Sequence, residues 1–149
     1  MHDQPYARLA AMTLLSFIAM YILMYAMVDA FDSVYPNLNQ AYMAGLMAAP
    51  MVLIELLLMG GMYKNKIANL AIMAASIVAL IGCFALIRQQ TAITDVQFLK
   101  SMIPHHSGAI LMCREAPIQD AKIKALCAKI IDGQRQEIAD MKAMLAERR

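Results

Sequence analysis

Three long apolar runs constrain the fold of this chain more than any other feature of its sequence. They cover residues 9–28, 41–63 and 67–87. A helix rises about 1.5 Å per residue, so twenty residues span about 30 Å, the hydrocarbon thickness of a bilayer. The hydrophobic fraction is 61%, well above the roughly 45–50% of soluble chains. The sequence therefore predicts a transmembrane region over residues 1–92. A cleaved signal peptide is the alternative for the first run, which is longer and less basic at its start than such peptides are.

The charges of the connecting loops predict how these helices are oriented. The first connection, DAFDSVYPNLNQ, carries two aspartates and no base, whereas the second, YKNK, carries two lysines. Because basic loops tend to remain cytoplasmic, we expect the N-terminus inside and residues 93–149 outside. This location would be the periplasm or the outer face of a bacterial plasma membrane. Arg88, Lys100 and the later basic residues argue for the opposite orientation.

Residues 93–149 have the pattern of an extracytoplasmic helical hairpin domain. Thr94 and Gln97 fit a capping box at the start of the first helix, and Pro117 predicts its end. The second helix starts near Gln119 and continues to the C-terminus. A unit of roughly 55 residues would be marginal alone, so we expect it either to pair with a second copy into a four-helix bundle or to lie against the membrane part. We favour a homodimer, or a higher homo-oligomer. The predicted fold class is all-α: three transmembrane helices followed by an αα-hairpin that dimerises.

Soft and basic side chains cluster on the first helix of this hairpin. At 100° per residue, one inward stripe contains Phe98, Met102, His105, Ala109 and Met112. His106 lies beside the stripe, and Pro104 predicts a kink just before the histidines. Imidazole nitrogen and thioether sulfur together suit copper, particularly Cu(I). On the second helix, Gln134 could support the site. We predict metal ligands at Met102, His105, His106, Met112, Glu137 and Met141.

Two other interpretations of these residues stay open. The histidines could be structural, within a membrane protein that serves assembly or interaction and binds no metal. The chain could instead transport metal through a membrane stripe at i+4 spacing, formed by Met43, Met47, Met51, Glu55 and Met59. Methionine also packs adaptably between helices. Glu55 could then hydrogen-bond a tyrosine such as Tyr21 or Tyr25.

The cysteines, the glutamates and the net charge indicate which kinds of site and partner this chain can have. Cys113 and Cys127 could form a disulfide outside the cell, although their offset from the turn argues against pairing. A ferritin-like di-iron oxidase needs Glu-x-x-His pairs, and neither Glu115 nor Glu137 has a histidine three residues later. We therefore predict no enzyme, no catalytic residue and no organic cofactor. The net charge of +2 gives no reason to expect a nucleic acid partner.

The strings FLKSMIPHHSGAILM and IIDGQRQEIADMKAML resemble the family known as domain of unknown function 305. The resemblance covers about Asp95 to Leu145. The matching positions are Met102, His105, His106, Ala109 and Met112, then Ile130, Gln134, Glu137, Ile138 and Met141. The membrane region also looks like a membrane-anchored branch of that family. The resemblance implies a ferritin-like helical fold, an extracytoplasmic location and, for some members, copper binding or metal resistance. Many soluble members carry two hairpins, so a chain with one is expected to dimerise.

Overall fold

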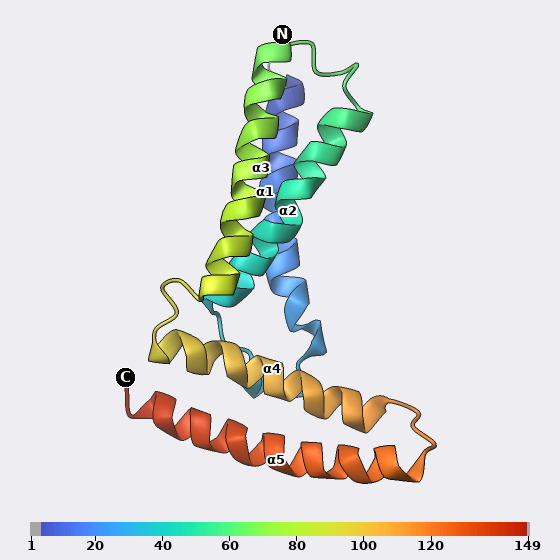
Figure 1. Ribbon diagram of the computed structural model, residues 1–149, viewed down its shortest axis with the longest axis vertical. Coiled ribbons are helices and arrows are strands. Elements are labelled where there is room, and N and C mark those ends of the chain that lie inside the picture. The colour runs from blue at the N-terminus through green and yellow to red at the C-terminus, as the bar shows by residue number, and fades with distance from the viewer. Residues whose placement is uncertain (1–3, 149) are drawn as a thin grey trace. The chain divides into compact units, whose positions relative to one another are not determined.

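The computed structural model describes residues 4–148, and every regular element in that range is a helix (Figure 1). The chain divides into two compact units. One contains residues 4–23 and 39–91, and the other contains residues 24–38 and 92–148. The α-helices are α1 (Gln4–Leu23), α2 (Leu38–Leu58), α3 (Lys66–Gln89), α4 (Asp95–Glu115) and α5 (Ala121–Ala146), and two short 3₁₀ helices, η1 (Met24–Met27) and η2 (Phe31–Ser33), follow α1.

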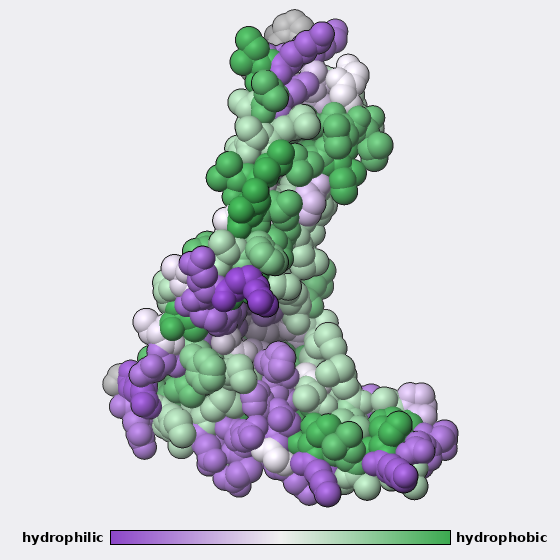
Figure 2. All heavy atoms as spheres, viewed as in Figure 1, coloured by the Kyte–Doolittle hydropathy of each residue, from purple (hydrophilic) through white to green (hydrophobic). Residues whose placement is uncertain are grey.

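The first unit contains most of three helical segments that are long and apolar enough to cross a membrane, as the sequence predicts. These are Gln4–Met27, Leu38–Leu58 and Lys66–Gln89. Only α2 has an extensively buried face, which consists of Ala44, Ala48, Ala49, Val52 and Leu56. Small side chains allow close approach: a Cβ at Gly45 would lie 2.8 Å from the Sγ of Cys83 on α3. The outer surface is apolar, and Figure 2 shows it as green along most of this unit.

Polar side chains tie the helices of this unit together near the α2–α3 connection. The Tyr6 hydroxyl donates to Oδ1 of Asn69 at 2.8 Å and accepts from the backbone N–H of Asn65 at 3.1 Å. Asn65 also caps the N-terminus of α3. Glu55 accepts a 3.0 Å hydrogen bond from the hydroxyl of Tyr63. A tyrosine partner for Glu55 was therefore correctly predicted, but it comes from the connection after α2 and not from the first span.

The second unit is built on the antiparallel pair α4 and α5 (Figure 1). Its core contains Leu99, Ile103, Ile110, Ile138, Met141 and Leu145. Thr94 caps α4, and Asp120 caps α5 by accepting two backbone N–H bonds at 2.8 and 3.0 Å. Ala116 has extended angles before Pro117 and ends α4, as predicted.

A disulfide joins Cys113 of α4 to Cys127 of α5. Their Cα atoms lie 5.1 Å apart, which is within the usual range for a disulfide. The offset argument against pairing was therefore wrong. The expected offset came from the number of residues between Pro117 and each cysteine. Because α5 begins only at Ala121, the residues between Pro117 and Ala121 are not helical and do not add to the offset between the two helices.

The connection between α1 and α2 packs on α4 instead of forming a free loop. Pro104 has no N–H, so the carbonyl of Lys100 loses its helical donor. The Asn37 side chain lies 3.4 Å from that carbonyl and donates to it. One turn later, the Ser107 hydroxyl accepts the Asp29 backbone N–H at 2.8 Å. Residues 24–38 therefore belong to the hairpin unit, on the other side of the predicted boundary at residue 92.

The contact with residues 24–38, in addition to the contact with α5, changes which face of α4 is buried. The predicted inward stripe is wrong in part, because Phe98 and Met112 are 49% and 53% exposed and His105 is also exposed. The buried residues of α4 are Leu99, Ile103, Pro104, Ser107, Gly108 and Ile110. The capping box is also only half present. Thr94 accepts from the Gln97 N–H, but the Gln97 side chain accepts from the N–H of Leu38.

Candidate metal site

His106 is the most constrained histidine of the hairpin. Its side chain is 12% exposed. Nδ1 lies 2.9 Å from the Met102 carbonyl oxygen, one helical turn earlier. Nε2 lies 2.9 Å from Oε2 of Glu137 on α5. Both ring nitrogens therefore have an oxygen atom within hydrogen-bonding distance. The ring is therefore held in one orientation, with Nε2 aimed at a carboxylate.

Glu137 and Gln134 complete this polar cluster from α5. The amide Nε2 of Gln134 donates to Oε2 of Glu137 at 3.4 Å. The carboxylate of Glu137 is 57% exposed, so it can exchange partners with solvent. The three side chains of His106, Glu137 and Gln134 thus form a cluster at the α4–α5 seam, open on one side.

The structure places the other predicted ligands around this cluster in different environments. The His105 and His106 rings lie with centroids 6.0 Å apart at an interplanar angle of 63°, and His105 is exposed. Met141 is a core residue with 8% exposure, and Met102 packs against the same core. Met112 lies on the surface. Imidazole nitrogen and carboxylate oxygen are therefore brought together, and the sulfur atoms are divided between core and surface.

The nitrogen and oxygen donors of the cluster suit a transition metal. In many metal sites, one histidine nitrogen binds the ion while the other donates to a carbonyl or carboxylate. The Nδ1 contact of His106 has that form, which leaves Nε2 as the binding atom and Glu137 as an oxygen donor beside it. Within residues 4–148, no group of three His, Cys, Asp or Glu side chains has metal-site geometry. A complete coordination shell would therefore need a thioether, water or a further chain.

Two ion pairs connect the hairpin to residues 24–38. Nη1 of Arg114 lies 2.6 Å from Oδ1 of Asp29, and Nζ of Lys142 lies 2.7 Å from Oδ2 of Asp32. The hydrogen bond from Lys142 lowers the pKa of Asp32 below its usual value of 3.8. These pairs hold the connection on both helices of the hairpin.

Sequence reasoning missed the residues through which α4 contacts that connection. Ser107 is 1% exposed, and a Cβ on Gly108 would lie 3.3 Å from the Met27 carbonyl oxygen. Within the string HHSG, the two histidines are the predicted functional residues, whereas the serine and the glycine are the buried residues. A serine next to a glycine in a helix interior is the signal that could have indicated a close backbone approach.

The membrane methionines line no interior path within the described helices. Met43, Met47 and Met59 are 39%, 44% and 43% exposed on the unit that contains α2. Met51 and Glu55 are half-buried. The buried face of α2 is formed by alanine, valine and leucine. No contact among the described residues favours metal passage along this stripe, so transport stays a prediction from spacing.

Comparisons with known proteins identify the family. A family model described as "Domain of unknown function (DUF305)" matches residues 59–145, which is more than half of the chain and starts well before the resemblance seen at Asp95. "Uncharacterized protein L153" of Acanthamoeba polyphaga mimivirus is 33% identical over 141 residues, covering 93% of this chain and 91% of that relative. No solved structure shows a significant match. On the length of both alignments, the chain belongs to the DUF305 family.

Proposed function

We propose that this chain is a membrane-anchored metal-binding protein that handles copper outside the cytoplasm. The anchor is the three-helix unit. Large apolar side chains such as Leu15, Ile67 and Val78 are 66%, 82% and 70% exposed on it. Exposed apolar surface of this extent needs a lipid or protein cover. The basic YKNK connection supports a cytoplasmic N-terminus.

The disulfide between Cys113 and Cys127 supports the proposed location of the hairpin. Disulfides persist in oxidising compartments and are rare in the cytosol. The three predicted crossings place α4 and α5 on the side opposite the N-terminus, which is the oxidising side. Loop charge and cysteine pairing are independent features of the sequence, and they agree on this orientation.

The arrangement of His106 is the single observation that carries the metal proposal. Its Nδ1 is held by the Met102 carbonyl and its Nε2 faces Glu137. In the proposed site, His106 and His105 supply nitrogen, Glu137 supplies oxygen and Met102 supplies a thioether from the edge of the core. Met112 and Met141 flank the site. The carboxylate adds a donor suited to Cu(II), whereas the thioethers suit Cu(I). Metal ions compete with protons for imidazole and carboxylate donors, so the affinity should increase with pH.

Metal titration of the full chain, purified without a histidine tag, tests this proposal. We expect one Cu(I) or Cu(II) per chain with micromolar or tighter affinity. His106→Ala should weaken binding at least tenfold, in keeping with the roughly 10–100-fold losses at such positions. His2→Ala, at the remaining histidine of the sequence and outside the described residues, is the matched control. Absence of binding, or binding unchanged when His105 and His106 are both alanine, would refute the proposal.

We also propose that the hairpin forms a four-helix bundle with a second copy. The observation that favours it is the apolar surface of α4 and α5, which Figure 2 shows as a green patch over α5. Its exposed side chains are Phe98, Met112, Ile123, Leu126 and Met144. Leu126→Glu should convert a dimer to a monomer in native mass spectrometry. Ala128→Glu, at an exposed position on another face of α5, should leave the mass unchanged. A wild-type monomer would refute dimerisation.

A further inference from the structure

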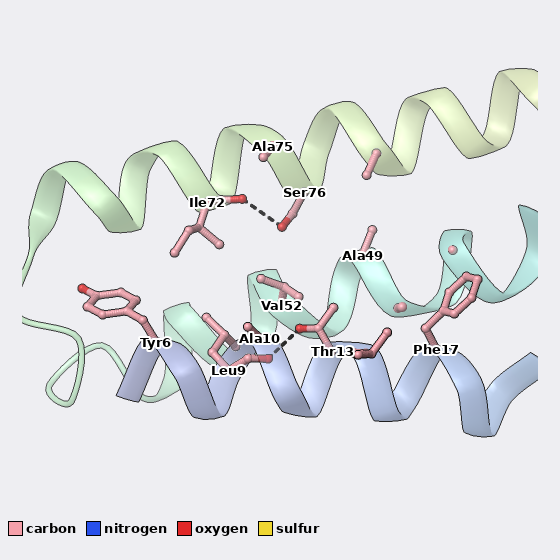
Figure 3. A pocket seen from close by; sticks show the side chains of 14 residues that line it. Tyr6, Leu9, Ala10, Thr13, Phe17, Ala49, Val52, Ile72, Ala75 and Ser76 are labelled. Atoms are coloured by element: carbon pink, nitrogen blue, oxygen red, sulfur yellow. Dashed lines mark hydrogen bonds between the residues drawn. The ribbon is translucent and has the colours of Figure 1, made fainter. Parts of the chain in front are cut away.

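An open groove runs between α1, α2 and α3, and no residue discussed above as a site lies in it (Figure 3). It encloses about 590 Å³, within the range of roughly 300–1,000 Å³ that ligand sites occupy. Its walls are apolar and mostly small. They include Leu9 and Ala10 of α1, Ala49 of α2, and Ile72 and Ala75 of α3.

The hydroxyls of Thr13 and Ser76 in the walls already have hydrogen-bond partners within their own helices. The Thr13 hydroxyl donates to the Leu9 carbonyl at 2.8 Å, and the Ser76 hydroxyl donates to the Ile72 carbonyl at 2.9 Å. Figure 3 shows both bonds as dashed lines. These hydroxyls need no partner from an occupant, so the groove suits a ligand segment that consists only of hydrocarbon.

The length of the groove corresponds to one leaflet of a bilayer. On α1 it extends from Tyr6 to Phe17. Those eleven residue steps correspond to about 16 Å of helix, close to half of a hydrocarbon core about 30 Å thick. A groove of this length accommodates one acyl chain that enters from one membrane surface.

The end of the groove at Tyr6 is basic. The Tyr6 hydroxyl contacts Asn65 and Asn69, which places this end beside Lys64 and Lys66. Arg8 follows Tyr6 by two positions, about 200° around α1, and so faces away from the groove. Lys64 and Lys66 are exposed, and no acidic partner within residues 4–148 forms an ion pair with either of them. Basic pockets between membrane helices on the cytoplasmic side attract anionic lipid headgroups.

We propose that this groove binds one acyl chain of an anionic phospholipid, whose headgroup lies beside Lys64 and Lys66. A transmembrane helix from a second copy would also fit an apolar groove lined by small residues. That helix would bring a second copy of Lys64 and Lys66 to the same membrane surface, and like charges repel. A phosphodiester headgroup has the complementary charge. This inference rests on the membrane anchoring in the proposed function and is independent of copper.

Native mass spectrometry of the detergent-purified full chain tests the proposal with added phosphatidylglycerol, and with phosphatidylcholine for comparison. We expect one retained phosphatidylglycerol per chain and a preference of about fivefold or more over phosphatidylcholine. Ala75→Phe fills the groove from an exposed wall position and should reduce retention about tenfold. Ala74→Phe is the matched control, because Ala74 is also exposed on α3 but does not line the groove. Ala10→Phe repeats the test from α1.

The headgroup contact is tested separately by charge removal. Replacing Lys64 and Lys66 together with glutamine should abolish the preference for phosphatidylglycerol. Arg88→Gln, at the other end of α3, should leave it unchanged. Equal retention of both lipids, or retention unaffected by Ala75→Phe, would overturn the proposal. Loss of dimer in Ala75→Phe with lipid retention unchanged would also overturn it and assign the groove to a second copy. Extraction of the chain from membranes by alkaline carbonate would instead refute the membrane anchoring itself.

Discussion

Removal of the disulfide between α4 and α5 should destabilise the hairpin by a calculable amount. Cys113 and Cys127 are 14 positions apart, so the bond closes a loop of 15 residues when both cysteines are counted. Closing a loop of that length is worth about 3 kcal/mol through the lost entropy of the unfolded chain. Since every 1.4 kcal/mol corresponds to a factor of ten, serine at both positions should increase the opening equilibrium constant about 150-fold.

Amide hydrogen exchange of the full chain, followed by mass spectrometry, measures that constant. The most protected peptides of α4 and α5 should lose about two orders of magnitude of protection in the double variant. Addition of a reductant to the wild-type chain should reproduce the loss. Cys83→Ser is the control, because Cys83 is the free cysteine of the other unit.

The reasoning fails if protection in the hairpin falls less than tenfold, which would mean that the bond contributes under about 1.4 kcal/mol. It also fails if Cys83→Ser reduces protection of α4 and α5 as much as the double variant does. In either case, packing of the Leu99 and Ile138 core, and not chain entropy, would determine the stability of the hairpin.

Three further predictions concern the hairpin unit. Ser107→Ala should destabilise it by about 1–3 kcal/mol, because the Asp29 N–H is left without its buried acceptor, and exchange at that amide reports the change. Asp120→Ala should cost about 1 kcal/mol through the lost N-cap of α5, seen as faster exchange in its first turn. Lys142→Ala should raise the Asp32 pKa toward 3.8 in a carboxyl NMR titration. Because the folded pKa is depressed, this exposed pair stabilises above pH 3.8 and loses its contribution as pH falls through the folded pKa. The contribution should be under about 1 kcal/mol and should decrease with salt.

Much of the helical framework could be predicted from local sequence. Span length, the Thr94 cap and the break at Pro117 depend on residues within a few positions of each other. Ile138, Met141 and Leu145 also follow helical spacing on the buried face of α5. Because these residues are three and four positions apart, they share one face of the helix, and that face packs against the α4 residues of the hairpin core.

The candidate site was predicted less completely. His106 and Glu137 lie together as facing helices should bring them, but His105 and Met112 lie on the surface. Periodicity on α4 indicates which residues share a face and cannot identify which face is covered.

The sequence by itself determined where this chain is helical, which helices are apolar enough for a membrane, and which soft and basic side chains share α4. Only the tertiary structure decided which of those side chains are buried. The connection of residues 24–38 packs on α4 through Asn37 at the Lys100 carbonyl and Asp29 at Ser107. Contacts between residues more than 60 positions apart leave no periodic signal, because each depends on the path of a loop and not on the repeat of a helix.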